Sequence, residues 1–354
     1  MEWVIAIGLF LIGLVLIVKG GDIFVDAAMW LAERTGIPKL IIGATVVSVA
    51  TTLPEMLVSF FAAEAGKVDM ATGNAIGSVT ANTGLILGIA LICMPSVINR
   101  REYWLKSLLM LLAAGVLVLF AFSGSIGAVP NVILIVIFIV FLADNIFQAK
   151  TAMMEKENTI YKLSAYQKST KAVRNAKRVT VRTAEVLYVE NVLPTDKKQR
   201  RREMFVNVLK FIGGAVFLAV GSRLLVDNGS KLALFIGVPE RIIAVTIIAV
   251  GTSLPELVTT LTAIKKKQSA LSAGNIIGAN IIDLSLILPI SSLISGKALP
   301  VSAQFASVDM PVCLLIALIA LIPMLITKKF SRWQGVVMVV LYVVYLIITT
   351  IVIG

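Results

Sequence analysis

The chain has 354 residues, of which 58% are hydrophobic, and its mean hydropathy is +0.96. This composition is too apolar for a soluble domain of this length, so soluble enzymes and soluble binding modules are excluded at the start. The net charge is +12 and the sequence contains no histidine, which rules out an imidazole metal site and an imidazole proton relay. Both cysteines, Cys93 and Cys313, lie in apolar runs and look like small hydrophobic residues. We expect a membrane protein that is not an enzyme and holds no cofactor.

Apolar runs of about twenty residues recur along the chain, and such a run is long enough to cross a bilayer core of roughly 30 Å. Glu2 stands where a signal peptide would be basic, and no small-residue cleavage site follows, so the first run is interpreted as a true span. The expected fold class is an all-α polytopic membrane protein with ten transmembrane helices. The predicted spans are 3–32, 38–64, 69–95, 104–123, 128–148, 205–234, 239–264, 269–295, 307–327 and 333–353.

Residues 149–204 differ in composition from the spans on either side. They contain 14 Lys or Arg and 6 Asp or Glu, a net charge of +8. Because positive charge gathers in cytoplasmic loops, we predict a basic cytoplasmic loop here, which places both chain termini outside the plasma membrane. No folded basic module is visible, so nucleic-acid binding is not expected, whereas membrane lipid headgroups are a modest alternative partner.

The first half of the chain aligns with the second half without a gap after a shift of 201 residues. Polar residues, prolines and glycines fall in one register, which shared hydrophobicity alone would not produce. Examples are Asp26 on Asp227, Gly36 on Gly237, Pro38 on Pro239, Glu55 on Glu256, Asn74 on Asn275 and Gly77 on Gly278. The predicted organisation is a first five-helix repeat at 1–148, the basic loop at 149–204 and a second five-helix repeat at 205–354.

Five spans are an odd number, so the two repeats must enter the membrane from opposite sides. Inverted repeats of this kind are typical of secondary transporters, whose binding site lies near the midplane where the repeats meet. A channel or a scaffold that transports nothing could also be built this way. The residues inside the repeats must therefore decide between these classes.

Each repeat contains one apolar span interrupted by a Pro-Glu pair, in SVATTLPEMLVS (48–59) and AVGTSLPELVTT (249–260). Proline lacks an amide hydrogen, so Pro54 and Pro255 should interrupt their helices and free carbonyl groups before them. The carboxylates of Glu55 and Glu256 follow directly, and an acid inside a membrane is costly unless it is paired, protonated or bound to a cation. The alternative is that each glutamate lies near a helix end and extends its carboxylate to the membrane surface. The presence of the same Pro-Glu pair inside a span of both repeats argues against it. The neighbouring hydroxyls belong to Thr51, Thr52, Thr252 and Ser253.

The next span of each repeat carries a polar stripe at helical spacing. GNAIGSVTAN (73–82) places Asn74, Ser78 and Asn82 four residues apart, and GNIIGANIID (274–283) does the same for Asn275, Ala279 and Asp283. Helix packing through glycine and asparagine is the alternative interpretation. It is weaker for Asp283, which is a further intramembrane acid.

The candidate groups are oxygen donors or amides, with no thiolate or imidazole among them. Hard oxygen ligands suit Ca²⁺, which takes about 6–8 of them, and also Na⁺. Three carboxylates nearly balance either one Ca²⁺ or several monovalent ions. Because the same oxygens cannot hold both sets of ions together, exclusion of one by the other supplies a physical basis for antiport.

The paired motifs TTLPE with GNAIGS, and GTSLPE with GNIIGAN, resemble the two repeats of the cation/calcium exchanger superfamily, in its compact prokaryotic sodium/calcium branch. The resemblance implies an inverted bundle of ten helices, four central cation sites, and sliding of the first and sixth helices. By motif position it implies that Glu55 and Glu256 are the main Ca²⁺ ligands, with Asn82 and Asp283 beside them. It assigns further calcium or sodium contacts to Ser48, Thr51, Thr52, Ser78, Ala249, Thr252 and Ser253, with Ser48 and Ala249 acting through their carbonyls.

The resemblance implies a Ca²⁺/Na⁺ antiporter that works by alternating access, with Ca²⁺ and Na⁺ as its partners. A monomer is the expected state, and an oligomer is left open as an alternative. Ala279 stands where the family usually has serine, so the sodium stoichiometry is open. Asp283 resembles the acid of potassium-dependent members, which keeps K⁺ cotransport as an alternative. Proton/calcium exchange and a passive cation channel also remain as alternatives, although the proton/calcium branch usually carries a different acidic motif.

Overall fold

The computed structural model describes residues 2–33, 48–98, 100–171, 197–265 and 269–352. Within those ranges it is almost entirely helical, and nine helices are long and apolar enough to cross a membrane. The predicted span 38–64 begins outside the described residues and enters them at Ser48. The predicted all-α polytopic class is confirmed, and the ten-span plan is consistent with the described helices.

The first half of the chain forms helices that follow the predicted spans. They are α1 (Glu2–Glu33), α3 (Ser48–Thr51), α4 (Leu53–Glu64), α5 (Val68–Ala81), the π-helix η2 (Asn82–Leu87), α6 (Gly88–Cys93), α7 (Arg100–Ala121) and α8 (Ala128–Lys171).

The second half repeats this order. Its helices are α10 (Lys197–Ile236), α11 (Glu240–Ile243), η3 (Ala244–Ile248), α12 (Ala249–Thr252), α13 (Leu254–Lys265), α14 (Ser269–Ile282), η4 (Asp283–Ile287), α15 (Leu288–Ser295), η5 (Phe305–Asp309), α16 (Met310–Thr327), α17 (Arg332–Ile347) and η6 (Ile348–Val352).

Two short antiparallel ribbons join the halves. β1 (Ser96–Val97) pairs with β4 (Lys329–Phe330), and β2 (Ser125–Ile126) pairs with β3 (Leu299–Pro300). Each ribbon takes one strand from each half of the chain. Because β1 precedes α7 and β2 follows it, the two ribbons fasten the halves at opposite ends of that helix.

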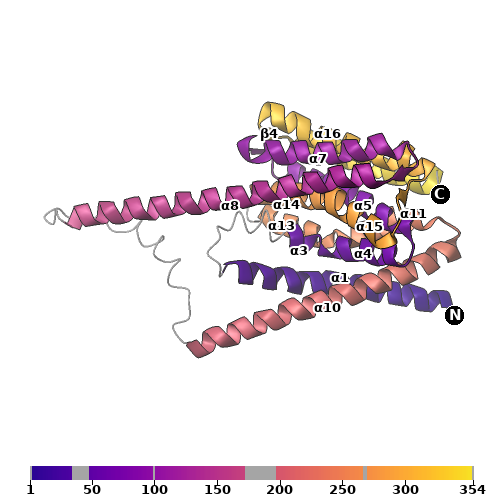
Figure 1. Cartoon of the computed structure of the whole chain (residues 1–354), viewed down its shortest axis with the longest axis horizontal. Coiled ribbons are helices and arrows are strands. Elements are labelled where there is room, and N and C mark those ends of the chain that lie inside the picture. Colours follow the sequence, from indigo (N-terminus) through magenta and orange to yellow (C-terminus); the bar gives the residue numbers. More distant parts are fainter. Residues whose placement is uncertain (1, 34–47, 99, 172–196, 266–268, 353–354) are drawn as a thin grey trace.

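Helices α1 and α10 lie side by side along one edge of the bundle (Figure 1). They approach closely at two glycine pairs: a Cβ on Gly221 would lie 2.8 Å from the Gly13 carbonyl oxygen, and a Cβ on Gly214 would lie 2.9 Å from that of Gly20. The order of these pairs shows that the helices are antiparallel. Gly13 corresponds to Gly214 and Gly20 to Gly221 under the 201-residue shift, so the crossing is symmetric between the repeats.

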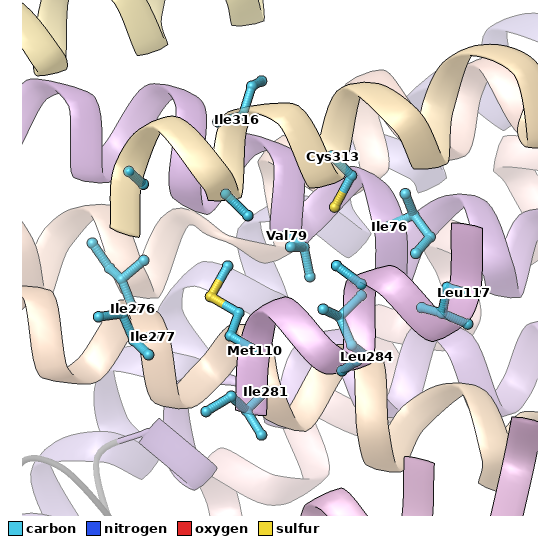
Figure 2. Packing of buried hydrophobic residues seen from close by; sticks show 14 of the residues in the cluster. Ile76, Val79, Met110, Leu117, Ile276, Ile277, Ile281, Leu284, Cys313 and Ile316 are labelled. Carbon is cyan, nitrogen blue, oxygen red and sulfur yellow. The ribbon is translucent and has the colours of Figure 1, made fainter. Parts of the chain in front are cut away.

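The main hydrophobic core lies between the two halves and is built from helices of both. Figure 2 shows Ile76 of α5, Met110 of α7, Ile281 of α14 and Cys313 of α16 meeting in it, and all four side chains are buried. A core shared in this way fixes α5 and α14, which carry the polar stripes, against each other.

Helices α8 and α10 run past the predicted boundaries of the basic loop. α8 continues to Lys171 and α10 begins at Lys197, so residues 149–171 and 197–204 are helical. The predicted loop residues 172–196 lie outside the described part of the chain. Figure 1 shows both helices projecting from one end of the bundle, whereas the two chain termini lie at the other end.

Candidate functional site

Each Pro-Glu segment breaks its helix one residue before the Leu-Pro-Glu sequence. α3 ends at Thr51 and α4 begins at Leu53, while α12 ends at Thr252 and α13 begins at Leu254. The predicted interruptions are confirmed, and proline stands second in each new helix, where its missing amide hydrogen costs little. The glutamates consequently lie in the first turns of α4 and α13, where a helix favours negative charge.

The carbonyl groups of Ser48 and Ala249 are less free than the sequence predicted. The Ser48 carbonyl accepts hydrogen bonds from the Thr52 amide at 3.0 Å and the Thr52 hydroxyl at 2.6 Å. The Ala249 carbonyl accepts one from the Ser253 amide at 3.1 Å. The prediction that proline frees the carbonyls before it is wrong for Ser48 and Ala249, because the carbonyl that loses its amide donor lies four residues before each proline, at Ala50 and Gly251.

Asn82 and Asp283 occupy equivalent places at the start of wide helical turns. Asn82 opens η2 and Asp283 opens η4, each directly after a regular helix. Wide turns of this type widen the helix locally and are frequent at functional sites. Hydrophobic periodicity carries no signal for them, so the sequence analysis did not anticipate them.

Three carboxylates are fully buried at the centre of the molecule: Glu55, Glu256 and Asp283 each have 0% exposure. The charges of Glu256 and Asp283 both act on Glu55, so the three lie within electrostatic reach of one another. Ser253 donates its hydroxyl to Glu55 Oε1 at 3.1 Å. Within the described ranges, no partner lies within hydrogen-bond distance of either oxygen of Glu256 or of Asp283, or of Oε2 of Glu55, although the Thr51 hydroxyl lies near enough to act on Glu256.

Hydroxyl and amide groups from both repeats surround these acids. Thr252 donates to Asn74 Oδ1 at 3.3 Å and lies 3.4 Å from the Ser78 hydroxyl, while Ser48 donates to Asn275 Oδ1 at 3.0 Å. The Asn82 side-chain amide makes no hydrogen bond to any other described residue. The structure thus buries every predicted site residue, namely Glu55, Glu256, Asp283, Asn82, Thr51, Thr52, Thr252, Ser253, Ser78, Ser48 and Ala249.

This donor set fits a hard cation. Buried carboxylate oxygens without partners are costly in a low-dielectric interior, and a cation would satisfy them. Among the described residues, no three His, Cys, Asp or Glu side chains are grouped tightly enough to hold a metal ion by themselves. Hydroxyl, amide and carbonyl oxygens must therefore complete any coordination shell, as the predicted site requires.

The sequence analysis missed a second buried polar group. Arg241 forms an ion pair with Asp309 and donates to Gln304 Oε1 at 3.0 Å, and the Tyr345 hydroxyl donates to Asp309 Oδ1 at 2.8 Å. The side chains of Arg241 and Asp309 are 3% and 0% exposed. The signal available was Asp309 itself, an acid inside a strongly apolar run.

Comparison with known proteins identifies relatives along the whole chain. The family model for sodium/calcium exchanger protein matches residues 5–147 and 206–351. An uncharacterized membrane protein of Methanocaldococcus jannaschii is 31% identical and covers 96% of this chain and 97% of its own length. The sodium/calcium exchanger MaX1 of Methanosarcina acetivorans is 29% identical, with coverage of 96% and 97%.

A solved structure shares the same architecture. The sodium-calcium exchanger NCX_Mj soaked with 2.5 mM Na⁺ and 10 mM Sr²⁺ aligns with a TM-score of 0.63 and 26% identity, over 99% of both chains. The likeness spans both halves, including the interrupted helices that carry the buried acids.

Proposed function

Because this chain belongs to the sodium/calcium exchanger family, we propose that it is a secondary active antiporter that exchanges Ca²⁺ for Na⁺ across a membrane by alternating access. The observation that carries this proposal is the burial of Glu55, Glu256 and Asp283 within electrostatic reach of one another, with most of their oxygens unpartnered by any described residue. Three acids can neutralise one Ca²⁺ or several Na⁺ ions. The site needs either one Ca²⁺ or several Na⁺ ions to offset its negative charge. Because one set of ions must replace the other, transport of Ca²⁺ is coupled to transport of Na⁺.

The proposed roles follow the position of each group. Glu55 and Glu256, one from each repeat, would grip Ca²⁺ between them, and Asn82 and Asp283 would complete the middle of the site. Sodium ions would take the hydroxyl oxygens of Thr51, Thr52, Ser78, Thr252 and Ser253 on either side. The carbonyl oxygens of Ser48 and Ala249 would join them alongside the hydrogen bonds that they already accept. Ca²⁺ and Na⁺ enter here as transported substrates.

The chain is an integral multi-pass membrane protein, and its proposed orientation places both termini outside and the segment 149–204 in the cytoplasm. The charge of that segment favours this side. A monomer in the plasma membrane is the simplest form, because the two halves of one chain already supply all three acids of the central site.

The proposal is tested with purified protein in lipid vesicles. Vesicles loaded with Na⁺ are diluted into medium containing choline, and uptake of radioactive calcium is followed, with K⁺ added in one series and a pH gradient alone in another. An outward Na⁺ gradient should drive uptake well above vesicles loaded with choline. Ca²⁺ uptake that is independent of the Na⁺ gradient but driven by the pH gradient would overturn sodium coupling. Uptake that requires K⁺ would indicate K⁺ cotransport.

Replacing Glu256 with Gln tests the site. We expect Glu256→Gln to reduce Na⁺-driven Ca²⁺ uptake at least about a hundredfold, since loss of one partner in a buried charged site costs about 3–5 kcal/mol. The thermal unfolding temperature should not fall, because the substitution keeps the shape of the side chain and removes a buried charge. Uptake at the original rate by Glu256→Gln would contradict the assignment.

A further inference from the structure

Arg223 and Glu64 form an ion pair outside the central site. Arg223 lies on α10 and Glu64 is the last residue of α4, and Nη2 of the arginine is 3.2 Å from Oε2 of the glutamate. The guanidinium also lies 4.8 Å from the centre of the Phe61 ring, on the same helix as Glu64. The pair therefore ties α10 to the end of one interrupted helix.

The register of the two repeats gives both partners a counterpart of opposite charge. Shifted by 201 residues, Arg223 corresponds to Asp22 on α1, and Glu64 corresponds to Lys265, the last residue of α13. A pair between Asp22 and Lys265 would be the same contact with its charges exchanged. In the part of the chain that the structure describes, no ion pair joins these two residues.

The hydrogen bonds around the two central glutamates also differ between the repeats. Glu55 accepts a hydrogen bond from Ser253 at 3.1 Å, whereas the counterpart of Ser253, Thr52, donates to the Ser48 carbonyl and not to Glu256. Likewise the Asn74 side-chain amide donates to the Glu55 carbonyl at 3.1 Å, and no equivalent bond to Glu256 exists among the described residues. Two halves with matching motifs thus adopt different arrangements.

Helices α1 and α10 pack together as one unit, and this unit does not contact the two repeats equally. Their glycine crossing is symmetric, but α10 packs more extensively on α4 than α1 packs on α13. The pair of helices is therefore displaced as a body toward α4. A displacement in the other direction would bring α1 onto α13.

We infer that the two charge pairs are alternate stops for the α1–α10 unit. Arg223–Glu64 holds the unit in the state described here, and Asp22–Lys265 holds it in the opposite-facing state. In a transporter built from inverted repeats, moving one bundle against the other around a fixed site changes the side from which that site is open. α4 and α13 end at opposite ends of the bundle, so each pair marks one limit of this movement.

These four residues lie outside the central site, so they are positioning residues, and the inference rests on alternating access as proposed above. Both members of the observed pair are 61% exposed, so this stop is weak. An exposed pair shifts an equilibrium about twofold to fivefold. A weak stop suits a transporter, because each state must remain able to convert to the other.

The test uses chemical cross-linking of the full chain in vesicles, with Cys93→Ser and Cys313→Ala as background. A bifunctional maleimide should link Asp22→Cys to Lys265→Cys whenever the opposite-facing state forms. Adding Arg223→Glu, which repels Glu64, should raise the linking rate about twofold to fivefold. A further Glu64→Arg should return it to the starting value, whereas Lys231→Glu, an exposed charge on the same helix, should leave it unchanged.

The mirror experiment links Glu64→Cys to Arg223→Cys. Here Asp22→Lys, which repels Lys265, should raise the linking rate by a similar factor. The inference is overturned if residues 22 and 265 never link, if Arg223→Glu leaves their linking unchanged, or if Glu64→Arg fails to reverse its effect. Cross-linking reports conformation without any ion gradient, so absence of Na⁺-driven Ca²⁺ uptake alongside the expected linking would refute the coupling and leave the stops standing.

Discussion

Ala279 holds the position that Ser78 holds in the other repeat, so one half of the site lacks a hydroxyl that the other half has. Ala279 is fully buried on α14, four residues before Asp283. The Ser78 hydroxyl lies 3.4 Å from that of Thr252, which is the contact a serine at 279 could make with Thr51 by symmetry. The alanine therefore removes one oxygen from the side of the site that would hold Na⁺.

Substituting Ala279→Ser should strengthen sodium binding. One added hydroxyl ligand is worth about 0.5–1.5 kcal/mol, which lowers the Na⁺ concentration for half-maximal Ca²⁺ exchange about twofold to tenfold. Exchange measured over a range of Na⁺ concentrations checks this. Ala273→Ser, on the same helix but in the apolar core, is the matched control and should leave the Na⁺ dependence unchanged. An unaltered Na⁺ dependence in Ala279→Ser would place residue 279 outside the sodium site.

The residues proposed to bind the ions were accessible from the sequence because their motif is duplicated. Glu55 and Glu256 stand out since each interrupts an apolar run in the same register, and proline follows a local rule that predicts the break beside it. The pairing of Arg241 with Asp309 was not accessible, although Asp309 alone stands out as an acid in an apolar run. Their contact joins positions 68 residues apart, and the aligned residues of the first repeat are Leu40 and Leu108, so comparison of the repeats gives no hint of it.

The buried pair of Arg241 and Asp309 should be a main support of α11 against η5 and α17. Replacing Asp309 with Asn leaves a buried arginine without a counter-charge, which costs about 3–5 kcal/mol. Tyr345→Phe removes one hydrogen bond to the same carboxylate and should cost about 1 kcal/mol. Thermal unfolding of the detergent-solubilised protein should therefore rank Asp309→Asn well below Tyr345→Phe. Replacing both charges, as in Arg241→Met with Asp309→Leu, should recover most of the loss, and a double variant as unstable as the single one would refute the pairing argument.

The crossing of α1 and α10 depends on glycine because backbone meets backbone there. A Cβ on Gly214 would lie 2.8 Å from the Phe24 amide nitrogen and 2.9 Å from the Gly20 carbonyl oxygen, and neither atom can yield without separating the helices. Gly214→Ala should therefore destabilise the protein by about 1–3 kcal/mol and slow exchange.

The adjacent glycine supplies the control. A Cβ on Gly213 would meet nothing within 4 Å, so Gly213→Ala should be neutral or stabilise α10 by up to about 1 kcal/mol. Unfolding temperature and Ca²⁺ uptake measured for both variants separate a packing effect from a general effect of alanine. Equal behaviour of the two variants would show that the close crossing does not matter.

The whole bundle was predictable in plan but not in extent. Apolar run lengths and the inverted repeat indicate the spans, since crossing a bilayer demands a fixed helix length. The continuation of α8 to Lys171 has no such signal, because a helix that leaves the membrane is no longer marked by hydrophobicity and depends on local propensity. The end of the apolar, membrane-spanning part therefore lies inside one continuous helix.

The orientation of the molecule can be tested across that same helix. The apolar part of α8, Ala128–Gln148, has 21 residues and spans about 31 Å, enough to cross the bilayer core. Ser123 and Thr151 are both exposed and lie beyond its two ends, so they should face opposite sides of the membrane. Because segment 149–204 carries 14 Lys or Arg, Thr151 should face the cytoplasm.

One cysteine is introduced at position 123 or at position 151, in a Cys93→Ser background, and its labelling is measured. A membrane-impermeant maleimide should label Ser123→Cys in intact cells and Thr151→Cys only after the cells are opened, while the buried Cys313 stays unlabelled in both. The reverse pattern would invert the whole molecule and with it both termini, since Figure 1 places them at the end of the bundle away from the projecting helices. In an inverted molecule the Arg223–Glu64 and Asp22–Lys265 pairs would exchange sides of the membrane. The orientation therefore decides which pair lies on the cytoplasmic side.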